Sequence, residues 1–405
     1  MHFAASSSAP AASAHDVIVV GRGAIGCATA LGLAQAGLKV ALVGPAAAPD
    51  GGEWDSRIYA LSPASRLLLE RLRVWQALDA SRLAPVHDMR IYPSARAGAP
   101  ELHFGAYEAC VDSLACILEN RNLMQALERG LGFTGVQVFS QKIVDAQTDE
   151  PLASVGLEDG SRLQARLLVA ADGADSPLRG FLGLASAQRD YPQQAVVANF
   201  ATARAHQDCA YQWFGDNGVL ALLPLPGDRC SIVWSAPSAL AQTLMSLPAA
   251  ELARRVAEVS GHALGGLQAL GDARCFPLRL LQAESMVGPR AVLLGDAAHV
   301  LHPLAGQGMN LGFGDVTELL SVLQAREPFR DLGERLLLRR FERARREPVL
   351  AMKLATDGLQ RLFDPDAEPA LPALLRPMLA AREAGWQAVA AAGWLRRRLI
   401  RHAVS

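Results

Sequence analysis

A glycine-rich turn between two apolar strands, close to the start of the chain, most constrains the fold. Residues 16–20 (DVIVV) form a β-branched apolar run that is typical of a buried parallel strand. Residues 21–26 (GRGAIG) follow directly, residues 27–36 have helical spacing, and residues 38–43 form a second buried strand. This order of strand, GxGxxG turn, helix and strand predicts a dinucleotide-binding unit.

Each glycine of this turn has a physical role in such a unit. Gly21 allows the tight turn, Gly23 lets the backbone approach a pyrophosphate, and Gly26 permits close packing of the helix. The second strand should end in an acidic residue that binds the ribose, but Gly44 stands there. The alternatives that remain for the ribose contact are Asp50, Glu53 and a backbone group.

Residues 291–312 form a second candidate ligand-binding stretch. An apolar strand ends at Gly295-Asp296, and a glycine-containing turn then leads into a helix whose first turn begins at Met309. A helix N-terminus presents free N–H groups and a positive dipole end, so it and the aspartate could hold both ends of a polar, partly anionic ligand. An ordinary strand–loop–helix connection is the alternative. The candidate residues here are Gly295, Asp296, Pro303, Gly306, Gly308, Met309 and Asn310.

Two further predicted helices carry polar side chains that could reach a phosphate. Arg57 stands just before a helix predicted over residues 63–72. Arg121 and Gln125 share one face of a helix predicted over residues 116–127, because they are four residues apart. A solvated surface position is the alternative for all three side chains.

The remaining chain predicts an α/β fold with a second sheet inserted into it. Asp172 opens a turn directly after the apolar strand at residues 165–170. Residues 191–235 show short strands separated by turns, which is the pattern of an antiparallel sheet, and residues 238–270 are predicted to be helical. The chain after residue 316 is expected to be mostly helical.

The composition excludes several classes of protein. The formal net charge of -1 argues against a nucleic-acid-binding protein. The six cysteines include no CxxC pair, so neither a metal site nor a disulfide framework is predicted. No apolar run approaches the length of a membrane span. Residues 1–14, rich in alanine and serine, are expected to form a disordered extension rather than a signal peptide.

The end of the chain is basic and amphipathic. In residues 394–401 (WLRRRLIR), apolar side chains are interleaved with arginines. Such a segment can lie on an anionic membrane surface, and a helix packed on the body of the protein with solvated arginines is the alternative. The expected location is therefore cytoplasmic, with peripheral contact to the inner face of the membrane as a hypothesis.

Three Gly/Asp motifs at strand ends, at residues 21–26, 171–179 and 295–312, resemble in this order the class A FAD-dependent aromatic hydroxylases. More narrowly, the chain resembles the ubiquinone-biosynthesis hydroxylase family. The stretches that carry this resemblance are SRIYALSPASRLLLERLRVW (56–75), ILENRNLMQAL (117–127), HPLAGQGMNLG (302–312) and LRRRLIRHA (395–403). The resemblance spans nearly the whole chain after residue 15.

The resemblance implies a Rossmann-like FAD-binding domain with an inserted antiparallel-sheet substrate domain, as in para-hydroxybenzoate hydroxylase, and a helical C-terminus. The implied FAD-binding domain is discontinuous and comprises residues 15–85, 111–185 and 285–350. Residues 86–110 and 186–284 would form the substrate domain, and residues 351–405 the helical C-terminal region.

The resemblance also implies FAD as the cofactor and a role for each candidate residue. Expected at the pyrophosphate are Gly21, Gly23, Gly26 and Arg57, and at the phosphate or ribityl chain Arg121 and Gln125. Expected around the flavin are Asp296 at a ribityl hydroxyl, the backbone of residues 308–310 at the pyrimidine edge, and Pro303, the one catalytic candidate, against the ring. Asp172 lies in a motif that in relatives also serves the pyridine-nucleotide reductant.

The implied reaction is ring hydroxylation of a lipophilic aromatic substrate, a polyprenylated phenol or quinone precursor of ubiquinone. Reduced flavin and O2 would form a flavin hydroperoxide that passes OH to the ring. No second GxGxxG unit is present, so the electrons would come from NAD(P)H bound transiently or from a redox partner. Other ubiquinone-biosynthesis proteins are candidate partners. The alternatives are a hydroxylase of a soluble aromatic and a non-catalytic flavoprotein scaffold; the oligomeric state and the hydroxylated carbon stay open.

Overall fold

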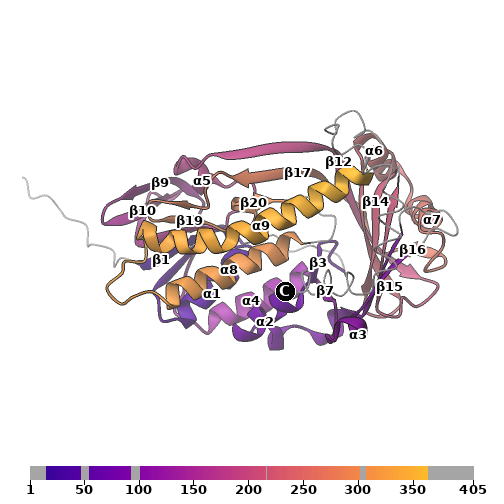
Figure 1. The fold of residues 1–405 in the computed structure, drawn as a ribbon, viewed down its shortest axis with the longest axis horizontal. Helices are drawn as coiled ribbons and strands as arrows, with labels where there is room; N and C mark the ends of the chain where they lie inside the picture. Colours follow the sequence, from indigo (N-terminus) through magenta and orange to yellow (C-terminus); the bar gives the residue numbers. More distant parts are fainter. Residues whose placement is uncertain (1–14, 47–53, 93–100, 216, 302–306, 364–405) are drawn as a thin grey trace, which may run out of the picture.

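The computed structural model describes residues 15–46, 54–92, 101–215, 217–301 and 307–363 of the 405-residue chain. In these residues the protein has the predicted α/β fold, with two large sheets and a small third one. The parallel sheet lies at one end of the molecule and most of the antiparallel sheet at the other (Figure 1). Helices pack beside the first sheet and cover one face of the second.

The first large sheet has a parallel core. Its strands are β1 (His15–Val20), β2 (Val40–Val43), β8 (Gln137–Phe139), β9 (Ile143–Asp149), β10 (Leu152–Leu157), β11 (Arg162–Ala170), β18 (Val287–Gly288) and β19 (Ala291–Leu293). The strands β19, β11, β1, β2 and β8 are parallel and adjacent in that order. Parallel strands end at the same edge of a sheet, so the turns after β1, β11 and β19 come together there.

Several helices pack beside this sheet. They are α1 (Ala24–Gln35), α2 (Pro63–Arg71), α4 (Asn120–Gly132), α8 (Gly308–Gln324) and α9 (Arg335–Phe363). Helix α1 contacts α4 and α8, and α9 runs along α8 (Figure 1). Helices α1 and α8 cross closely because Gly312 of α8 faces Ile25 of α1. A Cβ on Gly312 would lie 2.7 Å from Ile25 Cδ1.

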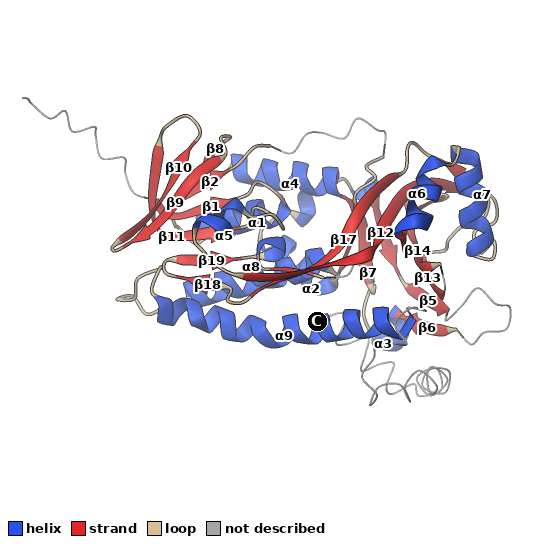
Figure 2. Cartoon of the chain, turned by 90° about the horizontal axis from the view of Figure 1, so that it is seen from above, coloured by secondary structure: helices blue, strands red, loops and turns tan. Residues whose placement is uncertain are grey.

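The second large sheet is antiparallel except for one pair, β5 with β13. Its strands are β5 (Asp88–Tyr92), β6 (Leu102–Gly105), β12 (Ser186–Thr202), β13 (Cys209–Gly215), β14 (Gly218–Leu225), β15 (Arg229–Pro237), β16 (Leu267–Ala269), β17 (Arg274–Ala283) and β20 (His299–Val300). Helices α6 (Ser238–Ser246) and α7 (Ala249–Val259) cover one face, over a core that contains Trp234 and Phe200. The long strands β12 and β17 extend from this sheet toward the parallel one (Figure 2).

A three-stranded sheet lies between the two large ones. It consists of β3 (Ile58–Leu61), β7 (Ala115–Glu119) and β4 (Leu83–Val86), with β7 in the centre. Its buried Ile117 and Ala84 share an apolar cluster with Leu225 of β14, which joins this sheet to the antiparallel one. The loop that precedes β3 therefore lies where the two halves of the molecule meet.

Two sequence-based helix predictions were wrong in part. The helix expected over residues 116–127 begins only at Asn120, because residues 115–119 pair with both β3 and β4 as strand β7. The helical prediction over 238–270 ends in β16, which pairs with the edge of β12. Short apolar runs fit both periodicities, and here sheet pairing decides.

Two predictions about the ends of the chain lie outside the described residues. They concern the extension at 1–14 and the basic segment at 394–401. Within the described part of the chain, no helix is both long and apolar enough to cross a membrane.

Candidate functional site

The glycine turn after β1 is required by backbone packing. Gly21 has φ +111°, and a Cβ there would lie 2.1 Å from the Ala171 carbonyl oxygen of the neighbouring strand end. A Cβ on Gly26 would lie 1.8 Å from the carbonyl oxygen of Gly21. At Gly23, by contrast, no atom lies within 4 Å of a Cβ position, so the backbone is open to a ligand. The three glycines thus have the geometry of the dinucleotide-binding turn.

Two helices begin at this edge of the sheet without a capping side chain. The N-cap of α1 is Gly23, which has no side chain, and that of α8 is Gln307, whose side chain accepts no hydrogen bond from a backbone N–H of its helix. A Cβ on Gly308 would also meet no atom of the described residues within 4 Å. Uncapped helix N-termini with open backbone are favourable sites for anionic or electron-rich groups of a ligand.

The side chain of Asn310 holds the start of α8 in place. Its Oδ1 accepts hydrogen bonds from Ser62 N at 2.9 Å and Ser65 Oγ at 2.7 Å, at the start of α2. Its Nδ2 donates to Ala60 O at 2.9 Å and to Gln307 Oε1 at 3.0 Å. The amide is therefore used in joining α8 to α2 and β3, and the first turn of α8 offers its backbone to a ligand.

The turn after β19 places an aspartate in the same region. Gly295 has φ +56°, and a short 3-10 helix (Gly295–Ala297) exposes the Asp296 carboxylate. The surrounding protein raises the pKa of Asp296 by desolvation, against the attraction of His299, Arg279 and Arg57. Because the residue is exposed at this edge of the sheet, its carboxylate can accept hydrogen bonds from ligand hydroxyl groups.

A second aspartate, Asp315 of α8, holds this turn in place from the protein interior. Its buried carboxylate accepts hydrogen bonds from Gly295 N at 2.8 Å and from Arg345 Nε at 2.7 Å, and lies 2.7 Å from His299 Nε2. Desolvation is the largest effect on its pKa and raises it, but the attraction of His299, Arg345 and the Gly295 N–H prevails, so the pKa lies below its usual range. Asp315 gave no signal in the sequence, because its partners lie in the turn at 295–299 and in α9, both distant from it along the chain.

Two residues that the sequence analysis did not single out, Tyr59 and Asn120, lie beside Arg57. Tyr59 Oη donates to Asn120 Oδ1 at 3.1 Å, and burial raises the pKa of Tyr59 to about 12 although Arg57 opposes this. Arg57 itself is exposed, and both it and Tyr59 interact electrostatically with Asp296. Both residues stand in the motif stretches SRIYAL and ILENRNL, which were the available signal.

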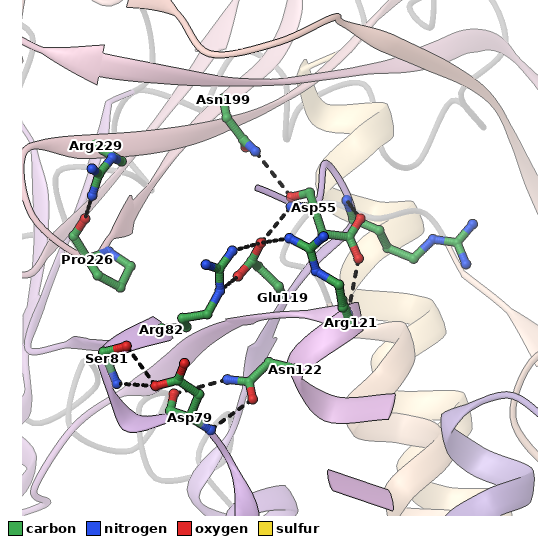
Figure 3. A network of polar contacts seen from close by, with 11 residues as sticks. Asp55, Asp79, Ser81, Arg82, Glu119, Arg121, Asn122, Asn199, Pro226 and Arg229 are labelled. Carbon is green, nitrogen blue, oxygen red and sulfur yellow. Dashed lines mark hydrogen bonds and ion pairs between the residues drawn. The ribbon is translucent and has the colours of Figure 1, made fainter. Parts of the chain in front are cut away.

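Arg121 and Gln125 occupy the first turns of α4. They line a polar cavity of about 260 Å³ together with Asp79, Arg82 and Asn122. Figure 3 shows Arg82 and Arg121 reaching the same buried carboxylate, that of Glu119. The two predicted phosphate-contact residues thus lie on the wall of a cavity that is lined by four side chains with N–H donors.

Asp172 has a structural partner set. Its Oδ1 accepts from Ser176 Oγ at 2.5 Å and its Oδ2 from Leu178 N at 3.0 Å, which holds the start of α5 (Pro177–Phe181). Burial raises the pKa of Asp172 although these hydrogen bonds lower it. Both carboxylate oxygens are engaged by the protein, so its predicted role toward FAD or the reductant stays a prediction.

The residues at the missing ribose ligand are only partly described. Gly44 has φ +142° and donates from its N to Phe139 O at 2.8 Å, whereas Asp50 and Glu53 lie outside the described residues. Pro303 and Gly306 lie outside them as well.

Next to Gly44, Arg22 has a buried Nε without a hydrogen-bond partner in the described part of the chain. An unpaired buried donor in a phosphate-binding turn fits an absent anionic ligand.

Comparisons with known proteins show the family of the chain. Residues 14–353 match the family model described as FAD binding domain. The chain is 35% identical over 400 residues to ubiquinone hydroxylase UbiL of Rhodospirillum rubrum, covering 96% of this chain and 89% of the relative. It is 32% identical over 396 residues to 3-demethoxyubiquinol 3-hydroxylase of Escherichia coli, covering 96% and 98%.

Solved structures show the same fold at lower identity. p-Nitrophenol 4-monooxygenase PnpA of Pseudomonas putida superposes with a TM-score of 0.75 at 17% identity, over 97% of this chain and 98% of that one. HpxO (R204Q) of Klebsiella pneumoniae, complexed with FAD, superposes with a TM-score of 0.73 at 20% identity, over 96% and 97%.

Proposed function

Because the chain belongs to the FAD-binding family that includes the ubiquinone hydroxylases, we propose a specific arrangement of cofactor and substrate for it. The protein is an FAD-dependent monooxygenase that hydroxylates an aromatic ring in ubiquinone biosynthesis. The substrate that we propose is a polyprenylated phenol or quinone precursor. The observation that carries the cofactor site is the pair of uncapped helix N-termini, of α1 and α8, at the sheet edge that also carries the exposed Asp296.

The residues present fit FAD. Gly23 and Arg22 Nε would receive the pyrophosphate at the start of α1, with Arg57 beside it. Asp296 would accept a hydrogen bond from the ribityl chain, and the backbone N–H groups at the start of α8 would face the flavin pyrimidine edge. Bound FAD supplies the chemistry that activates O2.

The protein's own contribution is binding, orientation and exclusion of water. The positive end of the α8 dipole stabilises negative charge at its N-terminus, by about 1–2 kcal/mol in a partly buried site. The antiparallel sheet would close the site from the other side and bring the substrate ring to the cofactor. An apolar enclosure of this kind keeps reactive species from water.

The boundaries of the two domains, the electron donor and the site of action are part of the proposal. Residues 15–85, 111–185 and 285–350 would bind FAD, and residues 86–110 and 186–284 would bind the substrate. NAD(P)H or a redox protein would supply the electrons. The basic segment at 394–401 would bring the enzyme to an anionic membrane surface and to other ubiquinone-biosynthesis proteins.

Mass spectrometry of quinone lipids from cells that lack the gene tests the substrate class. The proposal predicts less ubiquinone and accumulation of a polyprenyl phenol that lacks one hydroxyl, reversed by the wild-type gene. An unchanged quinone pool would contradict it and favour a soluble aromatic substrate. Complementation with the triple variant Arg57→Gln/Arg121→Gln/Asp296→Ala, which removes three proposed FAD contacts, separates catalysis from a scaffold role, because a scaffold that needs no FAD chemistry would restore ubiquinone fully.

A further inference from the structure

Asp55, in the loop before β3, makes four hydrogen bonds, which tie this loop to the junction of β7 with α4 and to β12. Its Oδ1 accepts a hydrogen bond from Arg57 N at 2.9 Å. Its Oδ2 accepts one from Arg121 N at 3.0 Å (Figure 3). Its own N donates to Glu119 Oε1 at 2.5 Å, and its carbonyl oxygen accepts from Asn199 Nδ2 at 3.1 Å. The side chain is buried, with 3% of the residue exposed. None of these contacts was predicted from the sequence.

The carboxylate of Asp55 joins two residues that we place at the cofactor. Arg57 belongs to the loop before β3 and Arg121 to the first turn of α4, and their backbone N–H groups share the one carboxylate. A carboxylate at a helix N-terminus is also favoured by the helix dipole. The positions from which both guanidinium groups project are therefore fixed by a single buried side chain.

The loop that carries Asp55 is held from both sides. Arg82 donates to both oxygens of Glu119, at 2.5 and 2.8 Å, and stacks over the Trp54 ring with its Cζ 4.2 Å from the centroid. Arg229 of β15 stacks over the same ring at 5.0 Å. These contacts, and the hydrogen bond from Asn199 of β12, connect the loop to the antiparallel sheet. The loop as a whole therefore has little freedom to move and restore the contacts that are lost when Asp55 is changed.

We propose that Asp55 is a positioning residue for FAD, acting through the backbone of Arg57 and Arg121. This inference rests on the proposed function in taking FAD as the ligand. An asparagine at position 55 has one acceptor oxygen and one NH2 group, so it can serve only one of the two N–H donors and opposes the other. The variant therefore displaces at least one of the two arginines.

The effect of the variant on FAD affinity is measured by titrating the full-length apoprotein with FAD and monitoring the quenching of flavin fluorescence. We expect Asp55→Asn to raise the FAD Kd by about tenfold or more. In the Arg57→Gln/Arg121→Gln background the same change should alter Kd by less than about twofold, because residues acting as one unit are not additive. An unchanged Kd for Asp55→Asn, or a tenfold effect that persists in that background, overturns the proposal.

Two further variants guard against a simple loss of folding. Glu342→Ala is the matched control, since Glu342 accepts from Ser285 Oγ at 2.6 Å and Met286 N at 2.9 Å, another carboxylate that holds a turn. It should lower the apoprotein Tm and leave the FAD Kd unchanged. If Asp55→Asn gives no folded protein, Asp55→Ser, which keeps one acceptor, enters the same comparison with the same criteria. If the wild-type protein binds FAD but the quinone lipids are unchanged in cells that lack the gene, the proposed function is refuted and the positioning role of Asp55 is not.

Discussion

Two aspartates serve the turn that follows β19, and their environments are opposite. Asp296 is exposed at the site and its pKa is raised, chiefly by desolvation, whereas Asp315 is buried, with a pKa held low by His299, Arg345 and Gly295 N–H. The first carboxylate is kept ready for a ligand at a cost to the apoprotein. The second satisfies the protein and gives the turn its shape. The turn thus combines one exposed carboxylate that can meet a ligand and one buried carboxylate whose partners are all within the protein.

The largest expected effect comes from removing the satisfied carboxylate. Asp315→Ala leaves the Arg345 guanidinium buried without its partner, and breaking a buried ion pair in this way costs about 3–5 kcal/mol. Urea unfolding of the apoprotein measures the loss. A loss below about 1 kcal/mol would mean that Asp315 does not hold the turn.

The exposed carboxylate of Asp296 should affect ligand binding instead. Asp296→Ala removes a hydrogen-bond acceptor for FAD, and we expect the FAD Kd to rise by about tenfold while the apoprotein keeps or gains stability. Fluorescence titration and urea unfolding of the same sample give both quantities. A variant that binds FAD as tightly as the wild type would remove Asp296 from the site.

The two carboxylates should also give opposite pH dependences of stability. The raised pKa of Asp296 means that the folded chain binds its proton more tightly, so its contribution to stability falls as the pH rises from 3.8 through the folded pKa. The lowered pKa of Asp315 gives a contribution that is present above pH 3.8 and is lost as the pH falls through the folded pKa.

Unfolding free energies of Asp296→Asn and Asp315→Asn, each subtracted from the wild type across this pH range, measure the two contributions. The account predicts differences of opposite slope. Slopes of the same sign would contradict the distinction between the two sites.

The smallest effect is expected at His299. His299→Gln keeps a side-chain donor that can reach Asp315 Oδ2, now at 2.7 Å from the histidine, so we expect a loss of at most about 1 kcal/mol. Thermal unfolding monitored by circular dichroism measures it. A loss as large as that of Asp315→Ala would show that the charge of His299, rather than its hydrogen bond, holds the network.

The sequence predicted those parts of the site whose cause is local. The turns at Gly21–Gly26 and Gly295–Asp296 follow a strand and precede a helix, and both the backbone requirement and the helix N-terminus are local consequences of that order. The α/β fold followed from the same pattern, since apolar runs typical of parallel strands alternate with helices.

The parts that were missed depend on contacts between distant segments. Asp315 with Arg345, and Asp55 with Asn199, are pairs that no spacing rule connects. Strand β7 was mistaken for the start of a helix because its pairing partners, β3 and β4, lie elsewhere in the chain. Local pattern cannot predict which distant residue satisfies a buried carboxylate.

Oxygen-isotope labelling tests the central claim, hydroxylation by O2 in ubiquinone biosynthesis, most directly. Cells lacking the gene are grown under oxygen-18 gas with and without a wild-type copy, and their quinone lipids are compared. We predict that the wild-type gene adds one oxygen-18 atom to the precursor that accumulates without it. Equal labelling and equal ubiquinone in both strains would contradict it.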